Sequence, residues 1–115
     1  MKVAYVAGPY RDKRGLWFIR QNIRAAERVA LELWRMGYAV ICPHKNTAFF
    51  DGAAPDDVWI KGDLVILERC DLVVMLPGSE KSEGAMAEFR HAVAKGVDVF
   101  RWPEGKDILQ ELVRQ

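Results

Sequence analysis

The sequence predicts an α/β fold: a single domain of three layers, α/β/α, around a doubly wound and mainly parallel sheet. Short apolar runs alternate along the chain with longer segments whose apolar residues recur at helical spacing. The first of these runs is typical of a buried strand. Right-handed crossovers between such strands place helices on both faces of the sheet, as in flavodoxin-like and Rossmann-like folds.

Four strands are expected, and breaking residues mark most of their ends. Gly8 and Pro9 end the first apolar run, Pro43 ends the second, and Asp71 introduces the third. The four strands are Val3–Ala7, Tyr38–Cys42, Leu72–Leu76 and Val97–Phe100.

Helices are expected between these strands and after the last one. Gly37 and Gly96 are suitable C-caps, while Asp56 and Ser82 are suitable N-caps. Gly62 falls inside one helix and lowers its helical propensity, which indicates close packing or a small break at that point. The four helices are Trp17–Met36, Asp57–Arg69, Ser82–Lys95 and Lys106–Arg114.

The composition indicates one globular domain that covers residues 1–115. Half of the 115 residues are hydrophobic and 29% are charged, and no repeat, low-complexity tract or linker divides the chain. The formal net charge of +1 gives no global field that would attract a nucleic acid polymer. No apolar run approaches membrane-spanning length, and the chain enters a strand at once without a signal peptide. We therefore expect a cytoplasmic protein without a membrane partner.

The two cysteines, Cys42 and Cys70, are expected to be free buried thiols, because nothing else in the sequence suggests secretion. No spacing of Cys and His resembles a zinc site, and neither a supported Ser-His-Asp set nor a catalytic cysteine signature is present. The sequence predicts no metal and no cofactor.

The stretch Ser82–Glu88 opens a helix directly after the third strand and is the leading candidate for a ligand site. A strand that leads through a turn into a helix points backbone N–H groups and a positive dipole end beyond the sheet. Ser82 suits the cap, and Gly84 lets a ligand approach the first turn closely. Glu88 shares a helix face with Gly84, which places a carboxylate beside an anion site. The alternative is that Glu88 is a surface residue of an ordinary amphipathic helix.

Two loops at the carboxyl ends of strands carry further candidates. The loop Gly8-Pro9-Tyr10-Arg11 either cradles a phosphate or is simply solvated. Such loops form the ligand site of doubly wound sheets, so His44 and Asn46 are candidate substrate contacts. The alternative for His44 is a hydrogen-bonded structural role. Phe49 and Phe50 either close over an aromatic base or plug the edge of the core.

Two carboxylates are the main candidates for chemistry. Asp63 and Glu88 come from helices on either side of the third strand, and both can reach the carboxyl edge of the sheet. Glycosyl transfer or hydrolysis needs two carboxylates about one sugar, one to attack or stabilise the anomeric carbon and one to handle protons.

Several short blocks follow one another through most of the chain, roughly from Lys2 to Phe100. They are Tyr5-Val6-Ala7-Gly8, Arg11, Asp63-Leu64 with Leu67, Cys70-Asp71-Leu72-Val73-Val74, and Ser82-Glu83-Gly84-Ala85-Met86-Ala87-Glu88 followed by Ala92 and Gly96. In this order and spacing they resemble the nucleoside 2-deoxyribosyltransferase-like superfamily. That superfamily includes the 2'-deoxynucleoside 5'-phosphate N-hydrolases and a related phage and bacterial group of small uncharacterised proteins.

The resemblance implies roles for the matching residues. Glu88 is the expected nucleophile that attacks C1' and displaces the base, Asp63 supports it near the sugar and leaving group, and Tyr5 orients the nucleophile or the sugar. Arg11, the neighbouring backbone amides and Ser82 are the expected contacts of a 5'-phosphate. Nucleoside transferases tend to carry an acidic residue in place of Ser82, and a serine at a helix N-terminus suits an anion that a carboxylate would repel.

The chain also departs from the family pattern. Pro9 removes one N–H donor from the expected phosphate cradle. Ala87 stands where the family has Gly, and Phe89-Arg90 replaces Leu-Gly, which is expected to add bulk near the nucleophile. The tail Ile108–Gln115 is a plain amphipathic helix without the Ser or Asn segment that family members lend across a dimer interface.

We therefore expect an N-glycosidase that hydrolyses the N-glycosidic bond of a (deoxy)nucleoside 5'-monophosphate. One alternative is a nucleoside deoxyribosyltransferase, in which a second base accepts the sugar. Another is a non-catalytic module that binds a nucleotide or sugar phosphate. The expected partners are a small-molecule nucleoside or nucleotide and further copies of the chain.

A last alternative is an interaction protein whose function lies in its oligomer, because four tryptophans are many for this length. Each of them is otherwise accounted for by ordinary core packing. We expect a homodimer or a higher homo-oligomer. The four residues are Trp17, Trp34, Trp59 and Trp102.

Overall fold

The structure is a computed structural model and describes residues 1–114. Its centre is a four-stranded sheet in which every neighbouring pair is parallel, with the strand order β2-β1-β3-β4. The strands are β1 (Val3–Ala7), β2 (Ala39–Ile41), β3 (Leu72–Met75) and β4 (Asp98–Arg101). The predicted α/β/α architecture around a parallel sheet is confirmed.

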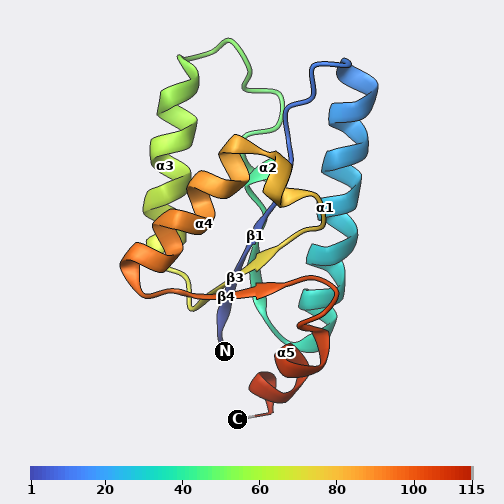
Figure 1. The fold of residues 1–115 in the computed structure, drawn as a ribbon, viewed down its shortest axis with the longest axis vertical. Coiled ribbons are helices and arrows are strands. Elements are labelled where there is room, and N and C mark those ends of the chain that lie inside the picture. Colours follow the sequence, from blue (N-terminus) through green and yellow to red (C-terminus); the bar gives the residue numbers. More distant parts are fainter. Residues whose placement is uncertain (115) are drawn as a thin grey trace.

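Helices cover both faces of the sheet (Figure 1). On one face lie α1 (Leu16–Met36) and α5 (Lys106–Val113), and on the other lie α3 (Asp56–Glu68) and α4 (Glu83–Lys95). Two short elements follow strands directly: α2 (Pro43–Asn46) after β2 and the 3₁₀ turn η1 (Ser79–Lys81) after β3.

Side-chain alternation along β1 decides which residues face each pair of helices. Ala4 and Val6 pack in the core with α1 and α5, whereas Tyr5 and Ala7 pack in the core with α3 and α4. All four residues are fully buried. The central strand therefore delivers the Tyr5 side chain to the layer that contains α3 and α4.

The helix ends follow the predicted signals with one exception. Gly37 and Gly96 are C-caps in the left-handed conformation, and the Ser82 side chain caps α4. The prediction that Asp56 caps α3 is wrong, because Pro55 occupies the N-cap. Asp56 is the first helical residue, where its negative charge still suits the positive end of the helix dipole.

The expected break or close packing at Gly62 is also wrong. The helix α3 continues through this residue, and a Cβ added to Gly62 would meet no atom within 4 Å. A single exposed glycine costs a helix only about 1 kcal/mol, which packing elsewhere in the helix readily offsets. The buried side chain of Leu67 supplies such packing.

The segment after β2 was expected to be a loop but begins with one helical turn. Pro43 occupies its first position, where the fixed φ of proline fits a helix and the missing N–H is not needed. This turn directs the His44 side chain inward, so that His44 is only 4% exposed.

Other predicted boundaries lie within one or two residues of the observed ones. The largest shift along a strand is at β4, which spans Asp98–Arg101 rather than Val97–Phe100. Cys42 and Cys70 are free and buried, as predicted. Within residues 1–114, no helix combines the length and the apolar character that crossing a membrane requires.

Candidate active site

The buried hydroxyl of Tyr5 meets a carboxylate of α4. It donates a hydrogen bond to Oε2 of Glu88, which lies in the second turn of that helix. Because the Tyr5 side chain is fully buried in the central strand, it is a rigid support for the carboxylate. One carboxylate oxygen is thus fixed, and among the described residues the other has no hydrogen-bond donor.

Asp63, on the neighbouring helix α3, belongs to the same cluster. Burial raises the pKa of the Asp63 carboxyl to about 6. Burial also raises the pKa of Glu88 to about 7; the hydrogen bond from Tyr5 opposes this rise, and the charge of Asp63 adds to it. For Tyr5, burial first and the charge of Glu88 second raise the pKa, so the phenol keeps its proton and remains a donor.

These shifts bring the titration of both carboxyls close to neutral pH. The pair titrates between about pH 6 and 7, and its two steps belong to the pair rather than to either residue. Near neutral pH the site therefore holds both an ionised carboxylate and a carboxyl group with a proton to give. Environments that separate the roles of two acids in this way are typical of acid–base and nucleophilic catalysis.

The first turn of α4, one turn before Glu88, is accessible to a ligand. Oγ of Ser82 accepts a hydrogen bond from the backbone N–H of Ala85 at 3.2 Å, which leaves the hydroxyl proton free to be donated. Gly84 is exposed, and a Cβ there would meet no atom within 4 Å. A ligand can therefore come close to the backbone of this turn.

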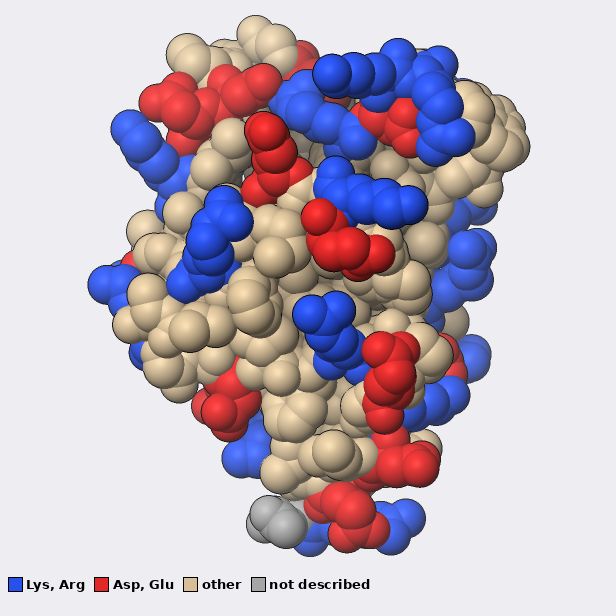
Figure 2. Space-filling view, in the orientation of Figure 1, with Lys and Arg blue, Asp and Glu red and all other residues tan. Residues whose placement is uncertain are grey.

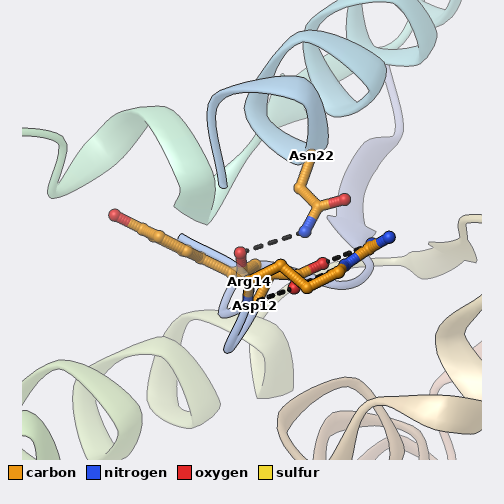
Figure 3. A network of polar contacts seen from close by, with 4 residues as sticks. Asp12, Arg14 and Asn22 are labelled. Carbon is orange, nitrogen blue, oxygen red and sulfur yellow. Dashed lines mark hydrogen bonds and ion pairs between the residues drawn. The ribbon is translucent and has the colours of Figure 1, made fainter. Parts of the chain in front are cut away.

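The loop after β1 is held in place by side chains. Figure 3 shows the amide Nδ2 of Asn22 donating to the backbone carbonyl of Tyr10 at 3.1 Å. In the same view, Asp12 accepts bonds from Arg14: from the backbone N–H at 2.9 Å, from Nε at 3.0 Å and from Nη2 at 2.7 Å. A Cβ at Gly8 would lie only 2.6–2.9 Å from side-chain atoms of Leu76, so glycine is needed where the loop begins.

His44 of α2 also contacts this loop. Its Nε2 donates to the backbone carbonyl of Pro9 at 2.8 Å, and its ring stacks on Tyr10 with 5.4 Å between centroids. Because a carbonyl only accepts, Nε2 carries the proton of the neutral ring. Burial lowers the pKa of His44, which keeps the ring neutral. The observed contacts of His44 are thus with the loop, and a direct contact with substrate stays a prediction.

Arg11 reaches across to the start of α3. Its Nη2 lies 2.7 Å from Oδ2 of Asp56, and both side chains are largely exposed. Figure 2 shows basic side chains gathered over the loop after β1 and the start of α1, with acidic side chains beside them over the start of α3. Arg11 is thus an exposed cation, and the loop after β1 that carries it lies at the same end of the sheet as the starts of α3 and α4 (Figure 1).

Asn46 does not join the carboxylates. It lies at the end of α2, in a shallow, mostly apolar groove beside the edge strand β2. The groove also contains Leu31 and Trp34 of α1 and the ion pair between Lys45 and Glu27.

Phe89 is the residue that follows Glu88 on α4. Phe89 lines a hollow of about 320 Å³ between α4 and β4, together with Met86, Val99 and Arg101. Neither carboxylate borders this hollow, so the candidate site rests on the chemistry of the buried carboxyls and not on the size of a cavity. Phe89 also packs against the core cluster that contains Tyr5, and the expectation that it adds bulk near the nucleophile stays a prediction.

Two residues that shape the site were not predicted from the sequence. Asn22 fixes the loop after β1. Trp59 lies four residues before Asp63 on α3, a spacing that puts both on one helix face and that could have drawn attention to it. Among residues 1–114, no group of three or more His, Cys, Asp or Glu side chains is placed to hold a metal ion.

The fold defines a three-layer α/β/α protein with a four-stranded parallel sheet. The model of the family described as "Domain of unknown function (DUF7768)" matches residues 2–102, and the chain belongs to this family. No curated protein sequence matches the chain.

The solved structures that share the fold include the following three. The 2-deoxyribosyltransferase of Bacillus psychrosaccharolyticus has a TM-score of 0.63 at 18% identity, over 86% of this chain and 70% of its own. A conserved protein from Enterococcus faecalis V583 has a TM-score of 0.71 at 23% identity, over 88% of this chain and 62% of its own. The CMP N-glycosidase BcmB of Clostridium botulinum has a TM-score of 0.57 at 20% identity, over 99% of this chain and 100% of its own. At these identities the likeness is one of fold.

Proposed function

We propose that the protein cleaves the N-glycosidic bond of a (deoxy)nucleoside 5'-monophosphate, with Glu88 as the nucleophile. The observation that carries the proposal is the buried Tyr5–Glu88 hydrogen bond beside Asp63. The proteins of like fold include a 2-deoxyribosyltransferase used to synthesise nucleosides and a CMP N-glycosidase, which supports this proposal.

In the first step the free oxygen of Glu88 attacks C1' and the bond from C1' to the base nitrogen breaks. The electron pair of that bond leaves with the base, which needs a proton. Asp63 supplies this proton from the arrangement of the pair in which Asp63 is protonated and Glu88 is ionised. Because the pKa of Asp63 is about 6 and that of Glu88 about 7, this arrangement is the less populated of the two, and it is the reactive one. Tyr5 holds the other oxygen of Glu88 and remains protonated throughout.

In the second step the glycosyl ester of Glu88 is hydrolysed. Asp63, now ionised, takes a proton from water as the water attacks C1', and the carboxylate of Glu88 is released. This exchange of roles is that of retaining glycosidases, in which one carboxyl acts first as an acid and then as a base. If a second base takes the place of water, the same ester leads to a deoxyribosyl transfer.

The phosphate is assigned to Ser82, Gly84 and Arg11. The helix α4 offers N–H groups and the positive end of its dipole, and Ser82 offers a hydroxyl proton at the cap, while the one carboxylate of the first turn, Glu83, is exposed. Arg11 adds a guanidinium that is held only by an exposed ion pair, which is worth at most about 1 kcal/mol. Gly8, Pro9 and Tyr10 shape the loop that carries it.

The test measures by chromatography the release of free base from a panel of ribo- and deoxyribonucleoside 5'-monophosphates. We expect base release by the unmodified protein and a loss of at least about 100-fold for Glu88→Gln, which keeps an acceptor for Tyr5 but cannot attack. The matched control is Glu83→Gln on the exposed first turn of the same helix, which should retain activity. Base release that survives in Glu88→Gln, or no release from any nucleotide, contradicts the proposal.

A further inference from the structure

The indole N–H of Trp59 has no hydrogen-bond partner although it is buried. It is one of two such side-chain atoms among the described residues, the other being Nδ1 of His44. An indole nitrogen can only donate, and a buried donor without an acceptor costs folding free energy. Such an exception calls for an explanation, and one explanation is an acceptor that arrives with a ligand and reaches the indole as neighbouring side chains change rotamer on binding.

The position of Trp59 connects this donor to the carboxylates. The helix α3 is continuous from Asp56 to Glu68, so Trp59 and Asp63 are one turn apart on one face, about 6 Å between their Cβ atoms. The helices α3 and α4 contact each other, and Leu67, one turn after Asp63, packs in the core cluster that contains Tyr5, so this face of α3 is the one turned to the candidate site. Trp59 is thus the next side chain from Asp63 toward the open end of α3.

An aromatic surface accompanies the donor. The ring of Phe50 lies 5.8 Å from that of Trp59, tilted by 47°. Phe50 is 48% exposed, and its neighbour Phe49 is fully exposed in a left-handed backbone conformation. A flat heterocycle that stacks on such rings covers apolar surface, and it presents its edge acceptors to a donor nearby.

We propose that Trp59 recognises the base: its Nε1–H donates to the ring acceptor next to the glycosidic nitrogen, while Phe50 packs on the face of the ring. This inference rests on the proposed function, because it takes the leaving base to lie at Asp63. The acceptors in that position are the 2-carbonyl oxygen of a pyrimidine and N3 of a purine. A site with a buried donor rejects an analogue that lacks the acceptor far more strongly than an apolar site does.

The experiment is a double-mutant cycle in which one change removes the indole N–H of Trp59 and the other removes the acceptor atom of the ligand. Binding is measured by calorimetry in the Glu88→Gln background, which blocks turnover, for the best nucleotide and for an analogue without the acceptor. For a purine the analogue is the 3-deaza nucleotide, and for a pyrimidine it is the 4-pyridone nucleotide. Trp59→Phe should weaken binding of the parent about 10-fold and that of the analogue less than about 2-fold.

The control is Trp34→Phe, which removes an exposed indole from α1 on the other face of the sheet and should change neither affinity. A second measurement requires no change at Trp59. In the otherwise unmodified protein, one of the four indole N–H proton resonances should move downfield with the parent but not with the analogue. Single replacements of Trp17, Trp34 and Trp102 by Phe assign it by elimination.

Equal weakening of parent and analogue, or none, overturns the inference, as does an unmoved indole resonance. A lack of nucleotide binding at millimolar concentration overturns it too. If base release depends on Glu88 but Trp59→Phe weakens binding of parent and analogue alike, recognition of the base by Trp59 is refuted and the proposed hydrolysis stands. Discrimination by Trp59 in a protein that releases no base refutes hydrolysis alone.

Discussion

The Glu88 carboxyl is more costly to ionise in the folded chain than in the unfolded one. Burial raises its pKa to about 7 in the folded protein, above the ordinary value of 4.5 for a glutamate. The folded state therefore holds the proton more tightly. The contribution of this group to stability is fully present below about pH 4.5 and is lost as the pH rises through about 7.

Glu88→Gln should consequently stabilise the protein at alkaline pH. At about pH 8 we expect the free energy of unfolding to rise by on the order of 2 kcal/mol, because the buried charge is gone and an acceptor for Tyr5 remains. The gain should shrink toward about pH 4.5, where wild-type Glu88 is itself neutral. Urea titrations at several pH values measure it, with Glu83→Gln as the exposed control. A gain that does not change with pH would show that burial of charge is not its cause.

At the scale of elements, local signals predicted most of the fold, because they act within a few residues. The glycine C-caps, the serine N-cap of α4 and the periods of the apolar residues all correspond to observed features. The continuity of α3 through Gly62 was not predicted, since tertiary packing outweighs one residue's propensity. The turn α2 was missed because a proline that ends a strand is equally suited to start a helix.

The candidate site was predicted only in part, for a related reason. Tyr5, Asp63 and Glu88 come together as the family spacing implied, since the order of strands and helices fixes their positions. The contacts of Asn22 and His44 with the loop after β1 depend on how α1, α2 and this loop pack together. The periodicity of the sequence does not predict such packing between separate elements. The orphan indole of Trp59 is likewise a property of packing.

The two helical glycines that face open space should respond alike in stability and differently in binding. Gly62→Ala and Gly84→Ala each remove backbone entropy from the unfolded chain without a clash, so each should add about 0.5–1 kcal/mol to the free energy of unfolding. At Gly84 the new methyl group also occupies the space in front of the first turn of α4. Nucleoside 5'-monophosphate binding, measured by calorimetry, should weaken for Gly84→Ala alone. Equal affinities in the two variants would remove Gly84 from the phosphate site.

At the scale of the whole molecule, tryptophan placement bears on the expected homo-oligomer. Trp102 is only 8% exposed and belongs to the core, whereas Trp17 and Trp34 on α1 are 63% and 53% exposed. Core packing thus accounts for Trp102 and leaves two large apolar rings of α1 in contact with solvent. The homodimer stays a prediction, which light scattering over a range of concentrations would test.

The parallel sheet also gathers the loop after β1, the start of α3 and the start of α4 at one end, where charges from distant parts of the sequence meet (Figure 1). There Arg11 is paired with Asp56 across 2.7 Å, although it is the cation assigned to the phosphate. An exposed pair of this kind is worth at most about 1 kcal/mol, whereas a phosphate offers a larger charge and more acceptor oxygens. A nucleotide should therefore displace Asp56, at a small cost in affinity.

Asp56→Asn should remove that cost. We expect a nucleoside 5'-monophosphate to bind about 2- to 5-fold more tightly to this variant, and the corresponding nucleoside to bind with unchanged affinity, since only the phosphate competes with Asp56. Asp57→Asn is the matched control, because Asp57 is the next residue of α3 and pairs with Lys61 instead. Calorimetry at two salt concentrations should show the gain decreasing as salt screens the competition. If Asp56→Asn leaves the affinity for the nucleotide unchanged, Arg11 does not contact the phosphate, and the anion must be held by the first turn of α4 alone.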